Sequence, residues 1–230
     1  SILSLHLNVG GIEKAICDQA NMLSEKYNVE IITLYKMNNT IPFKLNKNVK
    51  VIYLSKVKPN KEEFKKYLKE KDLINTFKEG IKAIKILYLK KQLTAEYIYN
   101  SDSKIIISTR LYFTKLLNKY KNPEAITIAE EHVYHHESKK YFRKLDKALK
   151  NIDYLLPASK YLTIDYKKKL KTNTTIDYIP LTINYFPEKI SKLEKNNIIA
   201  VGRLEPEKGF EDLIDIMSKV IKKNKNLKLT

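Results

Sequence analysis

Short apolar runs, each followed by a segment with helical spacing, constrain the fold of this chain more than any other feature. Strands that alternate with helices in this way are typical of βαβ units, in which each helix returns the chain to the start of the next parallel strand. We therefore predict an α/β fold with a mostly parallel sheet flanked by helices. The predicted strands of its main part are residues 2–7, 29–35, 49–54, 104–108, 125–129 and 152–156.

The overall composition fits a reduced protein of one large domain or about one and a half ordinary ones. Of the 230 residues, 43% are hydrophobic, and no stretch approaches the roughly 18 consecutive apolar residues of a membrane span. We expect no secretory signal, because the first apolar run begins almost at once. The single cysteine, Cys17, lies in an apolar helical pattern and cannot form a disulfide within the chain. These features predict a cytoplasmic protein.

The formal net charge of +18 suggests an anionic partner. Nucleic acid is the first candidate for such a charge, but the sequence shows no helix-turn-helix, zinc ligand set or aromatic RNA-recognition motif. An anionic membrane surface is the better candidate. We therefore expect no nucleic-acid partner, and a protein that can associate peripherally with the inner face of the cell membrane.

Residues 56–92 form the most basic block of the chain, with twelve lysines against five acidic residues. Apolar residues recur in it at helical spacing, which predicts one long or two consecutive basic amphipathic helices. Two interpretations stay open for this pattern. The apolar residues either face a membrane or pack on the core beneath a solvated outer face.

A further strand-loop-helix unit is predicted near the C-terminus. The apolar run 198–201 predicts a buried strand, Gly202 ends it, and an amphipathic helix begins near Gly209. One face of this helix carries Leu213, Ile214 and Met217.

Two cations, Arg203 and Lys208, lie in the loop of this unit. In α/β proteins such a loop and the following helix N-terminus lie at the carboxyl edge of the sheet, where ligands bind. A guanidinium, an ammonium and a helix N-terminus together suit a diphosphate.

A Gly-Gly turn, Gly10-Gly11, separates the first predicted strand from the first predicted helix. Two glycines at this point allow backbone N–H groups to approach a phosphate without an intervening Cβ. By itself, such a pair is also compatible with a plain tight turn.

Two motifs resemble those of one enzyme family. Residues 202–214 read GRLEPEKGFEDLI and resemble the GRL…KG…DLI signature of family-4 retaining glycosyltransferases. Residues 10–14 read GGIEK and resemble the first loop of the same family. The resemblance implies the two-domain GT-B architecture. Residues 1–182 would form the Rossmann-like, acceptor-side domain, and residues 183–230 the linker and the first strand-helix-strand of the nucleotide-sugar-binding domain.

By this resemblance the second Rossmann-like domain is truncated. A complete α/β domain needs about 100 further residues or more, and the family's paired-glutamate segment does not occur within the 230 residues. We therefore expect little or no transferase activity from this chain by itself.

The resemblance also implies roles for individual residues. His132, Arg203 and Lys208 would be catalytic, and the donor would be bound by Gly10, Gly11, Glu131, Arg203 and Lys208. A zinc site is the alternative for the histidines 132, 135 and 136, but they lack a fourth ligand at a familiar spacing, so we expect no metal. Arg110 lies at the end of a predicted strand, where it could contact a substrate, and we assign it to binding of the acceptor. The alternative is that it caps a neighbouring helix.

The implied reaction moves a sugar, with retention, from a nucleotide-diphosphate sugar to a glycan or lipid-linked acceptor, in cell-surface polysaccharide or glycolipid synthesis. No metal or cofactor is expected, and the donor is a co-substrate. The site would lie between the two domains, with cations stabilising the departing diphosphate. Two other functions stay open: a non-catalytic module that binds an acceptor or a membrane, and a basic nucleic-acid-binding protein.

Overall fold

The computed structural model describes residues 1–136, 138–183, 187–192 and 194–230. These residues belong to two compact units, Ser1–Asn184 and Tyr185–Thr230. The predicted division after residue 182 lies two residues from this split, and the roles assigned to the two parts stay predictions. Residues 184–186 and 193 of the predicted linker lie outside the described residues.

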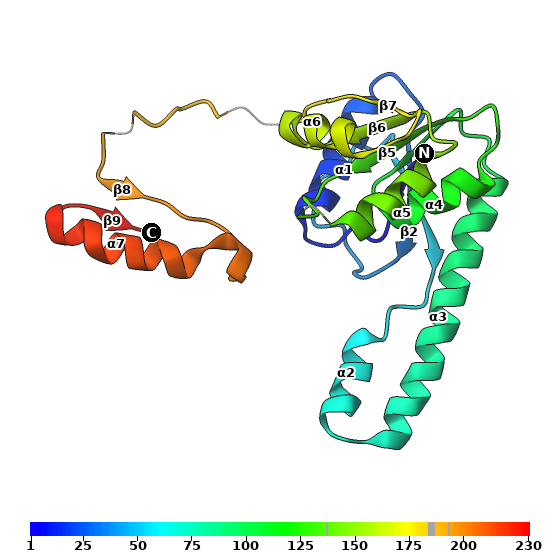
Figure 1. Ribbon diagram of the computed structural model, residues 1–230, viewed down its shortest axis with the longest axis horizontal. Coiled ribbons are helices and arrows are strands. Elements are labelled where there is room, and N and C mark those ends of the chain that lie inside the picture. The colour runs from blue at the N-terminus through cyan, green and yellow to red at the C-terminus, as the bar shows by residue number, and fades with distance from the viewer. Residues whose placement is uncertain (137, 184–186, 193) are drawn as a thin grey trace. The chain divides into compact units, whose positions relative to one another are not determined.

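The first unit contains a seven-stranded sheet in which every pair of neighbouring strands is parallel (Figure 1). The order is β3-β2-β1-β4-β5-β6-β7. Each predicted strand of this part is present, with ends shifted by at most three residues, and β7 is an additional short edge strand. The strands are β1 (Ile2–Ser4), β2 (Glu30–Tyr35), β3 (Lys50–Ser55), β4 (Ile105–Ser108), β5 (Ile126–Glu131), β6 (Tyr154–Pro157) and β7 (Thr175–Ile176).

Helices connect these strands and cover the sheet, which confirms the predicted α/β fold. The connecting helices are α1 (Gly11–Leu23), α4 (Leu111–Tyr120), α5 (Lys139–Leu149) and α6 (Lys160–Lys169). The basic block forms two consecutive helices, α2 (Lys61–Lys69) and α3 (Leu73–Tyr99), one of the two predicted arrangements. Figure 1 shows them as a hairpin that projects from the sheet.

Consecutive residues of the central strands point to opposite faces of the sheet, and both faces are buried. In β1, Ile2 belongs to the cluster under α1, together with Ile16 and the buried Cys17. Leu3 belongs to the cluster formed with α3, α4, α5 and α6, which includes Phe113. Burial on both faces explains why these strands are nearly continuous apolar runs rather than alternating ones.

The strand order creates a switch point between β1 and β4. From β1 the chain proceeds outward to β2 and β3, and then crosses back through the α2–α3 hairpin to β4, on the other side of β1. The loops that leave β1 and β4 therefore diverge at the carboxyl edge of the sheet. In open α/β sheets, this divergence forms the crevice in which ligands bind.

The second unit differs from its prediction in one respect. Its elements are, in chain order, β8 (Asn197–Ile198), the 3-10 helix η1 (Pro206–Lys208), α7 (Phe210–Lys223) and β9 (Lys228–Leu229). The predicted strand over 198–201 is present only in part, because β8 includes Ile198 but not the three residues after it. The predicted burial is wrong, since Ile199 and Val201 are 71% and 93% exposed. Two strands of two residues each offer too little surface to bury such a run. Of the three predicted face residues of α7, Met217 is buried and Ile214 is exposed.

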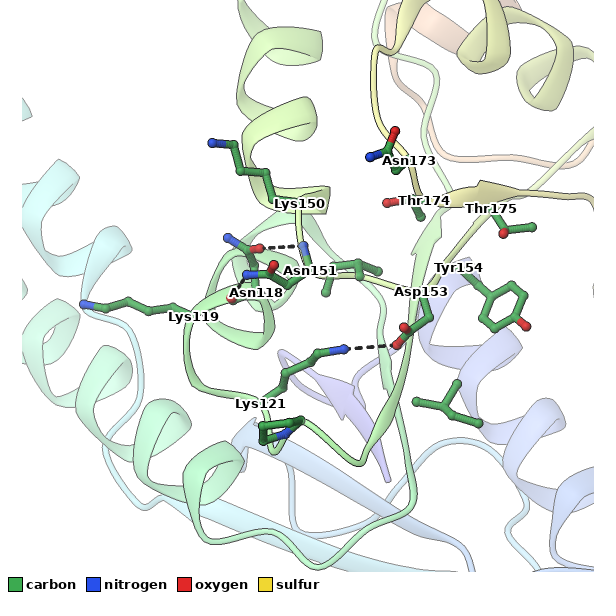
Figure 2. A pocket seen from close by; sticks show the side chains of 13 residues that line it. Asn118, Lys119, Lys121, Lys150, Asn151, Asp153, Tyr154, Asn173, Thr174 and Thr175 are labelled. Carbon is green, nitrogen blue, oxygen red and sulfur yellow. Dashed lines mark hydrogen bonds and ion pairs between the residues drawn. The ribbon is translucent and has the colours of Figure 1, made fainter.

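At the amino edge of the main sheet, Asp153 links β6 to β5 beside a hollow of about 770 Å³ (Figure 2). Its Oδ2 accepts hydrogen bonds from the Thr127 backbone N–H (2.7 Å) and hydroxyl (2.8 Å), and from the Lys121 ammonium (3.1 Å). Burial opposes ionisation of this carboxyl, but these donors outweigh it and lower the pKa of Asp153 below its ordinary value. The carboxylate therefore stabilises the fold in its charged form.

Substituting Asp153→Asn is expected to lower the melting temperature at neutral pH, and this difference is expected to shrink as the pH falls. Because the pKa is lower in the folded than in the unfolded state, the stabilisation is complete above the unfolded value of about 3.9 and is lost below it, through the folded value. Thermal unfolding followed from neutral pH to about pH 3 measures the difference. The exposed Asp102→Asn serves as the control. A difference that is independent of pH would contradict the assignment.

Candidate active site at the carboxyl edge of the sheet

The two glycines in the loop between β1 and α1 differ in the space that surrounds them. A Cβ placed on Gly10 would lie 2.1 Å from Oε2 of Glu13, whereas a Cβ on Gly11 would meet nothing within 4 Å. Helix α1 begins at Gly11 without a side-chain cap, so N–H groups of its first turn are available to an anion. A side chain at position 10 would therefore force the Glu13 carboxylate to shift, whereas Gly11 leaves the start of the helix open.

Glu13 joins the loops of β1 and β4 across the switch point. Its buried carboxylate accepts a hydrogen bond from Nη2 of Arg110 at 2.9 Å, and its Oε1 lies 3.6 Å from Nδ1 of His6. The Arg110 side chain itself is partly exposed. Glu13 thus holds a guanidinium at the edge where ligands are expected, and it neutralises part of that charge. The role of Arg110 in binding the acceptor stays a prediction.

His132 follows the end of β5 and is held by Glu130. The ring Nε2 of His132 lies 3.1 Å from Oε2 of Glu130, and Oε1 of Glu130 accepts a hydrogen bond from Gln19 of α1 at 2.6 Å. An ionised carboxylate can only accept, so Nε2 of His132 donates, and in the neutral imidazole Nδ1 is then the acceptor nitrogen. The His132 side chain is 7% exposed. Glu130 and Gln19 were not among the predicted site residues.

Glu131 points to the opposite side of the strand from Glu130. Its buried Oε2 accepts a hydrogen bond from the Tyr141 hydroxyl at 2.6 Å and lies 3.2 Å from Nε2 of His135, whose ring stacks on Tyr141. Burial, and then the charge of Glu131, raise the pKa of the Tyr141 hydroxyl, which therefore stays a donor. These contacts anchor the loop after β5 to α5. The predicted role of Glu131 in donor binding stays a prediction, while Glu130 lies on the side of His132.

The three neighbouring histidines in this loop contact different partners. His132 contacts Glu130, His135 contacts Glu131, and the exposed His136 has a positive φ of 42° and packs edge-on against Tyr134. Within residues 1–136, 138–183, 187–192 and 194–230, no group of three His, Cys, Asp or Glu residues could hold a metal ion.

In the second unit, the two predicted cations lie on the exposed segment that precedes α7. Nη2 of Arg203 lies 2.6 Å from Oε1 of Glu207, and its Nη1 lies 3.9 Å from Glu205. Gly209, with φ +64°, turns the chain from η1 into α7, so Lys208 stands directly before the helix N-terminus. An anion that binds Nη2 of Arg203 therefore competes with the Glu207 carboxylate.

The comparisons with known proteins support the fold. No protein-family model matches the chain, and no curated protein sequence does. Among solved structures, sucrose-phosphate synthase from Thermosynechococcus elongatus is similar, with a TM-score of 0.60 and 12% identity over 96% of this chain. The chain spans 60% of the length of that protein. The likeness shows the predicted α/β fold of the GT-B type, and membership of family 4 stays a prediction.

Proposed function

We propose that the protein is a glycosyltransferase that moves a sugar from a nucleotide-diphosphate sugar to a glycan or lipid-linked acceptor. The observation that carries this proposal is the set of polar groups at the switch point of a GT-B-type sheet. Three successive places along the carboxyl edge contribute to it: the open N-terminus of α1, the Glu13–Arg110 pair, and the Glu130–His132 pair.

These groups suit the departure of a diphosphate. Charge develops on the leaving group in the transition state, and fixed donors that face it lower the barrier. In the proposal the backbone N–H groups at the start of α1 contact phosphate oxygens. Arg203 and Lys208 of the second unit are proposed, separately, to bind a diphosphate. His132, oriented by Glu130, accepts a hydrogen bond from a sugar hydroxyl through Nδ1.

The finer parts of the proposal rest on the resemblance of residues 10–14 and 202–214 to family-4 enzymes. They are retention of configuration, independence from metal, and a place in the synthesis of cell-surface polysaccharide or glycolipid. A location in the cytoplasm, at the inner face of the membrane, belongs to the same proposal. The positive charge of the chain supports it.

Titration calorimetry with uridine, guanosine and adenosine diphosphates tests the proposal. We expect at least one of them to bind in the presence of a chelator, and the corresponding nucleoside without phosphates to bind at least about tenfold more weakly, because the charge-assisted contacts are made to the diphosphate. Binding that requires a divalent cation would contradict metal independence. If none of the three diphosphates bound, the result would favour the alternative function, a non-catalytic module that binds an acceptor or a membrane.

A further inference from the structure

One side of α3 carries a continuous row of exposed apolar residues. They recur at alternating intervals of three and four residues, which places them on one side of the helix, and they are between 42% and 70% exposed. This row, the apolar stripe of α3, consists of Ile74, Phe77, Ile81, Ile84 and Tyr88. Large apolar side chains that are exposed singly need no explanation, but a contiguous row marks an interaction surface.

Lysines flank this stripe. Lys78, Lys82 and Lys85 each follow a stripe residue by one position, so they lie along one border of the stripe. All three are exposed. Long lysine stems can lie along an apolar surface while the ammonium groups stay in a polar layer. The stripe and its lysine border together form the surface of an interfacial helix.

The opposite side of α3 is already occupied by protein. Near α2, the amide of Asn60 donates to the backbone carbonyl of Glu79 (2.8 Å) and to its carboxylate (2.6 Å), and the Phe64 ring lies 3.7 Å from a Cβ built on Gly80. Nearer the sheet, Ile86 is buried. The stripe is therefore not the core-facing side of a solvated helix, which was the open alternative for this block.

The charges around the stripe favour an anionic surface over a second copy of the chain. Glu79 is the single acidic residue between positions 73 and 95. Its carboxylate accepts from Asn60 (2.6 Å) and from the border lysine Lys82 (3.4 Å), so no acidic residue of this segment is left for Lys78 and Lys85. Two stripes packed against each other would bring lysine borders of the same sign together, which is unfavourable. Anionic headgroups would instead neutralise the lysines while the acyl region buries the stripe.

We propose that the stripe of α3 and its lysine border dock the protein on the surface of an anionic lipid bilayer. None of the helices in the described ranges is long and apolar enough to cross a membrane, so the helix lies in the interface. This inference identifies the surface behind the membrane association proposed above. It holds or fails independently of sugar transfer, because neither the nucleotide nor the site residues take part.

Co-sedimentation with vesicles tests the docking surface. We expect binding to phosphatidylcholine vesicles that contain phosphatidylglycerol, and at least about tenfold weaker binding to phosphatidylcholine alone, because each lysine near an anionic surface strengthens the attraction. Two double variants probe the surface: Phe77→Ser with Ile84→Ser, and Lys78→Glu with Lys85→Glu. Each is expected to weaken binding by about tenfold or more. The matched control is Ile164→Ser with Lys160→Glu, at exposed positions of α6, and it should bind as the unmodified protein does.

Fluorescence gives a second readout that does not depend on loss of function. The chain contains no tryptophan, so Phe77→Trp introduces a single reporter into the stripe. Its emission should shift to shorter wavelength with anionic vesicles, whereas that of Tyr99→Trp, at the exposed end of α3 near the sheet, should not.

Three outcomes would overturn the proposal. The first is equal binding of the stripe variants and the α6 control. The second is self-association that Phe77→Ser abolishes without any binding to vesicles, which would make the stripe a dimer interface. The third is binding to duplex DNA, with steep salt dependence, in place of vesicles.

Discussion

Removing Arg203 and Lys208 together is expected to weaken the binding of nucleoside diphosphates by about a hundredfold. Each cation is proposed to make a charge-assisted contact with the phosphates, and two such contacts contribute roughly this factor. Titration calorimetry of Arg203→Ala with Lys208→Ala measures it. The matched control, Lys222→Ala with Lys223→Ala in the last turn of α7, removes the same charge from the same unit and should leave binding unchanged.

Glu207 allows a sharper form of this test, because it already occupies the Arg203 guanidinium at 2.6 Å. If a phosphate replaces this carboxylate, Glu207→Gln should bind the diphosphate several-fold more tightly, since an exposed ion pair of up to about 1 kcal/mol no longer competes. A general loss of positive charge cannot explain such an increase. If Glu207→Gln weakened binding, or if the lysine control weakened it as much as the Arg203 variant, the role assigned to this loop would be wrong.

Replacing Gly10 by alanine is expected to weaken binding of the same ligands by between about tenfold and a hundredfold, because an overpacked site costs about 1–3 kcal/mol. The new Cβ would lie 2.1 Å from the Glu13 carboxylate. That carboxylate is buried and its Oε1 is bound by Arg110, so we expect the shift of Glu13 to disturb this ion pair. The same shift should lower the melting temperature.

Gly11→Ala is the matched control for this prediction. It introduces the same methyl group one residue later, where nothing lies within 4 Å, so the fold and the melting temperature should be retained. Two results would contradict the argument. Equal effects of the two substitutions would show that the turn responds to any side chain, and unchanged ligand binding in Gly10→Ala would show that the Glu13–Arg110 arrangement does not support the site.

The sequence by itself determined the class of fold and the order of its elements. The apolar runs are short, because each strand crosses the core once, and they lack alternation, because both faces of the central strands are buried. The cap of α6 is equally local, because the Ser159 side chain accepts a hydrogen bond from the Leu162 N–H three residues along the chain. Such features depend on residues a few positions apart, and the chain displays them directly.

The contacts at the candidate site came only from the tertiary structure. Gln19 and Glu130 are 111 positions apart, and Glu13 and Arg110 are 97 apart. Nothing local pairs them. Glu13 meets Arg110 only once the crossover places β4 beside β1, and Gln19 meets Glu130 only once β5 has joined the sheet next to β4. One signal was present, however. Side chains alternate along a strand, so Glu130 rather than Glu131 shares the side of His132, and this period of two could have identified Glu130.

For α3 and β8, likewise, the sequence predicted an apolar element, but only the structure showed whether its apolar residues are buried. Periodicity predicted an amphipathic helix in residues 56–92, but an apolar stripe is identical in sequence whether it faces a core or a membrane. Only the contacts of Asn60 and Phe64 with the other side of α3 decided that the stripe faces outward. Likewise, the run 198–201 was apolar enough for a buried strand, yet burial needs a partner surface, and the two-residue strands of the second unit do not provide one.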